Sequence, residues 1–175
     1  MISPAVPAVA HPVPTGALYS VLLLAHVACA AVGFGALAAT GLQARRARRG
    51  PAAAGSDGVR RYFRPGFNWA ARALYGVPVF GFALISSSQG AFAAGDGFVV
   101  AGLGLWALST VVAEAVVWPG ERRIQEVVST RWQTGGPETT GPDRRFDIDC
   151  RRVARAAALL SAVFLTAAVL MVAQP

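Results

Sequence analysis

The chain has 175 residues, of which 54% are hydrophobic and 14% charged, and its mean hydropathy is +0.48. Soluble domains average roughly 45–50% apolar and 25% charged residues, so this composition excludes an ordinary soluble domain and indicates a membrane protein. The net charge is +7, and all sixteen basic residues are arginine. Such a balance can signal nucleic-acid binding, but these arginines lie between apolar segments, so we expect no nucleic-acid partner.

Four apolar segments are each about as long as the ~20 residues that a helix needs to cross the hydrocarbon core of a bilayer. They cover residues 18–40, 67–88, 98–118 and 153–172. The sequence therefore predicts an all-α, four-helix transmembrane bundle over residues 17–173, preceded by a proline-rich tail at residues 1–16. The short connection at residues 89–97 favours the second and third helices as antiparallel neighbours.

The arginines predict how the chain is oriented in the membrane. Fourteen of them lie in two connecting segments, residues 42–66 and 119–152, which we expect to be cytoplasmic loops. Both termini are then extracytoplasmic. The arginine-only, alanine-rich composition is typical of GC-rich bacterial coding, so we expect a multi-pass protein of the bacterial plasma membrane. Within the second loop, residues 121–132 have apolar side chains on one face, which predicts a short helix lying on the inner membrane surface.

Small residues at helical spacing indicate where helices can approach each other closely. The first segment carries a small-residue ridge formed by Ala28, Ala31, Gly35 and Ala39. Ser109 and Ala113 form a shorter pair in the third segment. We expect both sets to pack inside the bundle; contact with another protein is the alternative.

One acidic residue, Glu114, lies inside the third apolar segment. An ionised side chain at the bilayer centre costs about 2.5–3.5 kcal/mol on insertion scales, so Glu114 needs a partner or a function. At 1.5 Å per residue, Glu114 lies about 6 Å and Arg72 about 7.5 Å from the inner ends of their segments. This shared depth predicts an intramembrane Arg72–Glu114 ion pair inside the bundle, with a structural role rather than a proton-carrying one.

His26 is the only histidine in the four segments. A haem held by two axial ligands would need a second one at the same depth, and Met171 lies about 10 Å away in depth at 1.5 Å per residue. We therefore expect His26 to form a structural hydrogen bond across the bundle, and we expect no haem or other cofactor. In the second segment, Pro78 and the nearby Gly76 predict a kink, because proline removes a helical donor.

Sites for metal binding and catalysis are not indicated. Asp147, Asp149 and Cys150 are close in sequence but match no strong metal-binding spacing, and we expect Asp149 to cap the start of the fourth helix. The sequence has no nucleophile beside a base, no HExxH motif and no phosphate-binding glycine loop after a strand. The sequence thus predicts a protein that is not an enzyme and has no metal site.

Three stretches together resemble a known group of proteins: "LYSVLLLAHVACAAVGFGALAA", "FRPGFNWAARALYGVPVFGFAL" and "AEAVVWPGERR". They are similar to bacterial integral membrane proteins grouped as domain of unknown function 2269, over about residues 17–172. That family has no assigned activity, so the resemblance implies a four-helix membrane protein and no specific chemistry. The composition is also similar to that of accessory subunits of actinobacterial respiratory complexes.

These observations favour a non-catalytic accessory or scaffold subunit of a larger membrane complex. Its expected partners are other integral membrane subunits or a second copy of the chain. The first alternative is a small transporter or proton-conducting protein that uses Glu114. A haem-binding electron carrier that uses His26 is the second.

Overall fold

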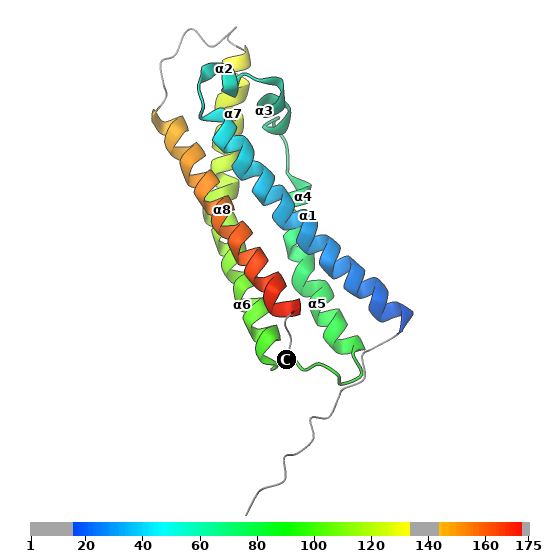
Figure 1. The fold of residues 1–175 in the computed structure, drawn as a ribbon. Coiled ribbons are helices and arrows are strands. Elements are labelled where there is room, and N and C mark those ends of the chain that lie inside the picture. Colours follow the sequence, from blue (N-terminus) through cyan, green and yellow to red (C-terminus); the bar gives the residue numbers. More distant parts are fainter. Residues whose placement is uncertain (1–15, 134–143, 173–175) are drawn as a thin grey trace, which may run out of the picture.

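In the computed structural model the chain forms an elongated bundle of helices (Figure 1). The structure describes residues 16–133 and 144–172. The expected proline-rich tail therefore lies almost entirely outside the described residues. The described part of the chain contains helices and no strand, so the predicted all-α class is confirmed.

Four columns of helix make up the bundle. The first and the last are single long helices, α1 (Ala17–Ala47) and α8 (Arg144–Val172). The second column consists of α4 (Trp69–Arg72), the 3-10 turn η1 (Ala73–Tyr75) and α5 (Gly76–Ser87). The third consists of α6 (Gly97–Val112), the π-helical turn η2 (Ala113–Val117) and α7 (Trp118–Gln133). Two short helices, α2 (Pro51–Ala54) and α3 (Asp57–Tyr62), connect the first two columns.

Each column is long and apolar enough to cross a membrane, over Ala17–Ala47, Trp69–Ser87, Gly97–Thr130 and Arg144–Met171. This is the architecture of a multi-pass membrane protein. The start of α1, the end of α8 and the α5–α6 connection lie together at one end, which we call the terminal end (Figure 1). The opposite end, where α1 ends and α8 begins, also carries α2 and α3; we call it the arginine end.

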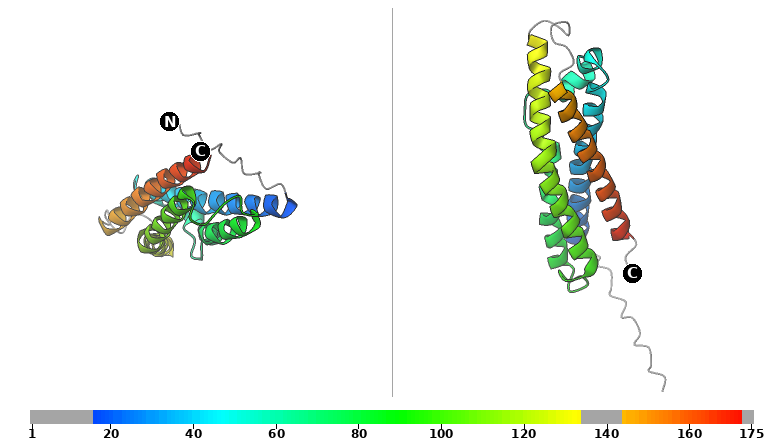
Figure 2. Two further views of the ribbon diagram at one scale, coloured as in Figure 1. Left: turned by 90° about the horizontal axis from the view of Figure 1, so that it is seen from below. Right: turned by 90° about the vertical axis from the view of Figure 1, so that its left-hand side faces the viewer.

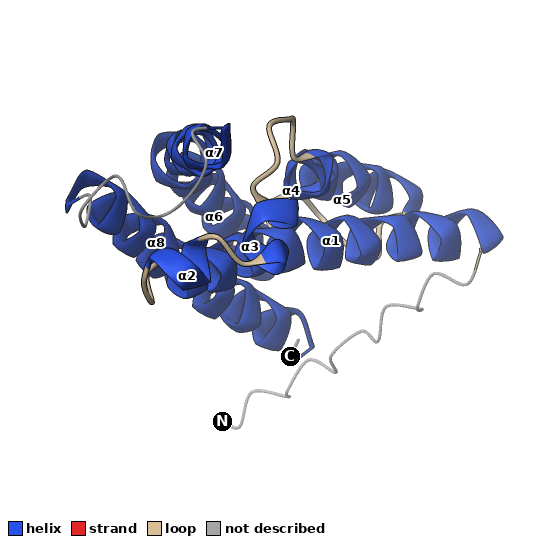
Figure 3. Ribbon diagram, turned by 90° about the horizontal axis from the view of Figure 1, so that it is seen from above, coloured by secondary structure: helices blue, strands red, loops and turns tan. Residues whose placement is uncertain are grey.

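The neighbours in the bundle are not those of the chain order. α1 packs most extensively against α8 and α5, and α6 packs against α8 (Figures 2 and 3). α5 and α6 contact each other only slightly, although a short connection joins them. The second and third columns are therefore not closely packed along α5 and α6, contrary to expectation; they meet through side chains nearer the arginine end.

Glycines of α1 explain this arrangement, because they let other backbones approach it closely. A Cβ added to Gly33 would lie 2.7 Å from the backbone nitrogen of Leu74 in η1. A Cβ added to Gly41 would collide with the Cβ of Ala157 in α8. Between these two contacts, Phe34 stacks on Phe164 of α8 with ring centroids 4.8 Å apart. α1 is thus the central helix, and it holds the second and fourth columns on different faces.

The small-residue ridge does not pack inside the bundle, which corrects the expectation from the sequence. Ala28, Ala31 and Gly35 are exposed and Ala39 is only partly buried. A Cβ added to Gly35 would meet nothing within 4 Å. The bundle instead uses the face of α1 that bears its bulky core residues together with Gly33 and Gly41. In the third column the expectation holds, because Ser109 and Ala113 are both fully buried.

The segments expected as cytoplasmic loops are largely helical. In the first, α1 continues to Ala47, and Tyr62 at the end of α3 folds back onto it. The Tyr62 hydroxyl lies 2.7 Å from the Thr40 hydroxyl and donates to the carbonyl oxygen of Ala36 at 3.1 Å. Burial raises the pKa of Tyr62, so this hydroxyl stays protonated and attaches α3 to α1.

The predicted helix on the inner membrane surface is also absent. Its residues belong to α7, which continues the third column through η2 (Figure 2, right). The apolar side of α7 packs against α8, and Ile124 and Val128 are buried there in one core with Val153. An amphipathic segment can bury its apolar face against a helix as well as against lipid, and here α8 takes that place.

The glycines of α1 provide a matched test of the packing. Gly33→Ala should lower the stability of the protein in detergent by about 1–3 kcal/mol, since the new methyl group meets the Leu74 backbone. Gly35→Ala should leave stability within about 1 kcal/mol of the wild type or raise it, because alanine is the better helix former. Thermal unfolding followed by circular dichroism measures both. Equal effects would show that the two faces of α1 are packed alike.

Candidate functional site

Pro78 leaves one backbone carbonyl of the second column without its helical hydrogen bond, and a side chain of α6 supplies a replacement. Proline has no N–H, so Pro78 cannot donate to the carbonyl oxygen of Leu74, four residues earlier. The indole nitrogen Nε1 of Trp106 in α6 donates to this carbonyl at 2.9 Å. The 3-10 turn η1 ends directly before Gly76, so the helical irregularity lies where Gly76 and Pro78 predicted it. One of the few direct bonds between the weakly packed second and third columns therefore depends on a proline.

His26 attaches α1 to the same region. Its ring nitrogen Nδ1 lies 2.9 Å from the carbonyl oxygen of Val77, as expected for a hydrogen bond across the bundle. Because a carbonyl only accepts, Nδ1 carries the proton and donates in this bond. A Cβ added to Gly81 would lie 3.3 Å from the His26 ring, so a glycine at this position lets the imidazole approach α5.

An apolar cavity of about 300 Å³ lies beside His26, between α1, α5 and α6. Its lining is almost entirely apolar and includes Phe82, Phe98, Leu103 and Met171. Met171 and His26 line the same cavity, although their positions in the sequence indicated different depths. The cavity would suit an apolar molecule with one hydrogen-bonding group.

A second polar cluster lies nearer the arginine end, around Arg72. Its Nη1 atom is 3.5 Å from Oε1 of Glu114, so the expected ion pair is present as a long contact. The guanidinium carbon lies 3.3 Å from the centroid of the Trp118 ring, a cation–π contact. The Tyr75 hydroxyl also donates to Glu114. Arg72 thus contacts both an aromatic ring and a carboxylate, and Glu114 contacts two partners from the second column.

The Arg72–Glu114 pair was expected inside the bundle, but Glu114 lies at its surface. The Arg72 side chain is 18% exposed, but that of Glu114 is 52% exposed. Ala113 and Val117 of η2 are fully buried, which leaves Glu114 on the outer side of this turn. Glu114 therefore faces the surroundings of the bundle while it contacts Arg72.

Two residues of this region were missed by sequence reasoning. The Asn68 side chain caps α4 by accepting from the backbone nitrogen of Ala71 at 3.2 Å, and its amide donates to Glu121 at 3.1 Å. Glu121 is only 5% exposed and links the start of α7 to the start of α4. An asparagine directly before a helix is a recognisable cap, but nothing local in the sequence identifies Glu121 as its partner.

The acidic residues near Cys150 bind arginines. Asp147 contacts Arg48 and Arg151, each at 2.8 Å, and Asp149 contacts Arg123 at 3.1 Å. Asp149 does not cap the fourth helix, because α8 begins earlier, at Arg144. Within residues 16–133 and 144–172, no group of three His, Cys, Asp or Glu side chains is placed to hold a metal ion.

Comparison of the chain with known protein families, with curated proteins and with solved structures finds no match. The resemblance to the domain of unknown function 2269 stays a prediction, and the function must be argued from the geometry.

The bond between Trp106 and Leu74 can be tested through the proline. Trp106→Phe should lower stability by about 0.6 kcal/mol and by no more than about 1.7 kcal/mol, the average and the maximum found for interhelical hydrogen bonds in a membrane protein. In a Pro78→Ala background the loss should be smaller, since position 78 then supplies an N–H to the Leu74 carbonyl. Thermal unfolding of the four proteins in detergent measures this difference. A loss of the same size in both backgrounds would show that Trp106 acts by packing alone.

The Arg72–Glu114 contact calls for a double-mutant cycle. Arg72→Leu should destabilise more than Glu114→Leu, because Arg72 also loses its contact with Trp118. The double change should cost less than the sum of the single changes, by about 0.5–1 kcal/mol, because the pair is long and half exposed. Thermal stability in detergent is again the measurement. Strictly additive losses would show no interaction and would return Glu114 to the candidate proton sites.

Proposed function

We propose that the protein is a non-catalytic subunit or scaffold of a larger membrane complex, and that the small-residue ridge of α1 contacts its partner. The supporting observation is the exposure of Ala28, Ala31 and Gly35 on the central helix of the bundle. These three residues are not buried by packing within the bundle.

Exposure of such a ridge matters more in lipid than in water. Lipid tails are as apolar as leucine, so helix association depends on close van der Waals contact, which small residues permit. A Cβ added to Gly35 would meet nothing within 4 Å, and Leu24 and Val32 on the same side of α1 are 70% and 50% exposed. The exposed small residues let the backbone of a second transmembrane helix approach this face of α1 closely.

The partner in this proposal is another integral membrane subunit or a second copy of the chain. The arginine-rich segments at the end of α1, in α3 and at the start of α8 lie at the arginine end, which supports a cytoplasmic position for that end. The terminal end would then face outward, in a bacterial plasma membrane. A respiratory complex as the assembly rests on the resemblance alone.

A proton-conducting role for Glu114 is the second candidate. Glu114 is half exposed and lies in a π-helical turn, a feature that is frequent at functional sites. Its contacts with Arg72 and Tyr75 favour a fixed carboxylate instead. A haem-binding role comes third, supported by the common cavity of His26 and Met171.

The ridge makes the proposal testable. Ala31→Leu and Gly35→Leu should each reduce recovery of the complex in a mild-detergent pull-down by about tenfold or more. A bulky side chain keeps the two helices apart, and a loss of about 1.4 kcal/mol of contact energy corresponds to a tenfold lower affinity. Gly104→Leu is the control, because Gly104 in α6 also has nothing within 4 Å. Native mass spectrometry identifies the partner. Isolation of a monomer alone, with proton flux in liposomes that depends on Glu114, would instead support the second candidate.

A further inference from the structure

A basic cleft of about 550 Å³ opens at the arginine end, between the last turns of α1 and the first turns of α8. Five arginines and one alanine line it: Arg45, Arg48, Arg49, Arg151, Arg155 and Ala154. The two helices are in close contact just before this point, where Gly41 meets Ala157. The arginines of the two helices are therefore gathered about one turn beyond that contact.

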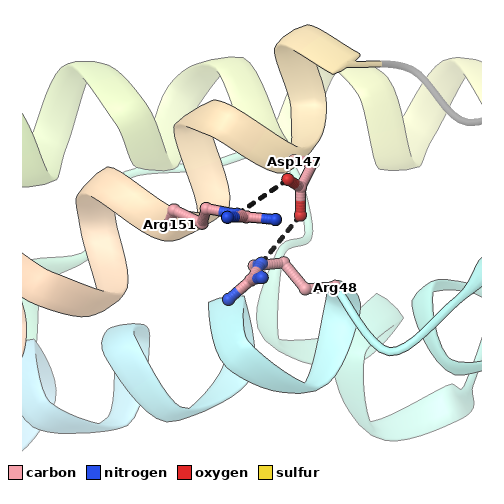
Figure 4. Close-up of polar contacts among 3 residues, drawn as sticks. All are labelled: Arg48, Asp147 and Arg151. Atoms are coloured by element: carbon pink, nitrogen blue, oxygen red, sulfur yellow. Dashed lines mark hydrogen bonds and ion pairs between the residues drawn. The ribbon is translucent and has the colours of Figure 1, made fainter.

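One carboxylate organises the cleft. Asp147 accepts from Nε of Arg48 through one oxygen and from Nε of Arg151 through the other, both at 2.8 Å (Figure 4). Both bonds use Nε, so the terminal Nη donors of the two guanidinium groups keep their capacity to bind an anion. Asp147 fixes the orientation of two arginines without occupying their outer donors.

The cleft is not electrically neutral. Among the described residues, Arg45, Arg49 and Arg155 form no ion pair with a carboxylate. Counting described residues only, the five arginines and Asp147 give the cleft a formal excess of four positive charges. The like charges in the cleft repel one another, and a bound anion would relieve this repulsion. Phosphate is a suitable anion because a guanidinium group can donate two parallel hydrogen bonds to its oxygens.

We propose that this cleft binds the phosphate headgroup of an anionic phospholipid. Basic pockets between transmembrane helices at the cytoplasmic side are suited to such headgroups. Leu42 lies three residues before Arg45, and Leu159 lies four residues after Arg155, so each leucine is on the same helix face as its arginine. Both leucines are exposed, by 57% and 53%, and can contact acyl chains while the phosphate contacts the arginines.

Because the basic cleft adjoins an exposed apolar surface, a lipid fits the site better than soluble phosphate, which has no acyl chains to contact that surface. The excess of positive charge further favours a lipid with two phosphates, such as cardiolipin, over one with a single phosphate. The site lies away from the small-residue ridge and does not depend on the proposed role of that ridge.

The test is native mass spectrometry of the purified full chain with cardiolipin, phosphatidylglycerol or phosphatidylcholine at equal concentration. The wild type should retain cardiolipin most strongly and phosphatidylcholine least. Replacement of Arg45, Arg49 and Arg155 by glutamine should weaken cardiolipin binding by about tenfold or more, since each basic residue near a charged lipid contributes substantially. These three arginines lie outside the Asp147 contacts, so the fold should persist, as circular dichroism can verify.

A matched control removes the same charge elsewhere at this end. Replacement of Arg46, Arg122 and Arg152, which are exposed and outside the cleft, by glutamine should change cardiolipin binding by less than about threefold, the effect of weak, screened attraction. Equal losses in the two triple variants would overturn the proposal in favour of diffuse attraction. Equal retention of the three lipids by the wild type would also overturn it, and this result needs no variant. Displacement of cardiolipin by millimolar inorganic phosphate would assign the cleft to soluble phosphate instead.

Discussion

Close approach of other backbones to α1 at Gly33 and Gly41 determines how this bundle is built. In lipid, burial of apolar side chains gives little preference for one helix neighbour over another, so close contact must supply it. Gly33 brings the backbone of η1 against α1, and Gly41 brings α8 against another part of the same helix. The third column then packs on α8, and between α5 and α6 the apolar cavity remains. The order of the columns follows from these contacts.

Polar bonds complete what the glycine contacts begin. The Leu74 carbonyl, which receives no bond from Pro78, accepts from Trp106 and so connects the second and third columns. His26 connects α1 to the carbonyl of Val77, just before the same proline. Unsatisfied backbone groups are costly in a membrane, so such bonds both remove that cost and fix which helices meet. The cavity beside His26 lies among these attachments.

Both proposals rest on parts of α1 that the bundle leaves uncovered. The small-residue ridge lies along the exposed face of the membrane-spanning part of the helix, and the basic cleft lies at its arginine end. The ridge exposes small side chains, and the cleft gathers five arginines. If both proposals hold, one central helix would contact a protein neighbour and a lipid headgroup at two depths.

The sequence by itself determined the class and the number of spans, because segment length and apolar content depend only on local composition. It also indicated the shared depth of Arg72 and Glu114 and the irregularity at Pro78, since helix rise and proline geometry are local properties. It could not decide which face of α1 packs inward, because the membrane-spanning part of that helix is apolar on every side. It also could not identify Trp106 as the donor to Leu74 or Asp147 as the partner of Arg48, 99 residues away. Those choices were made only by the tertiary structure, where backbone contact at glycines sets the positions of the helices and hence of every side chain between them.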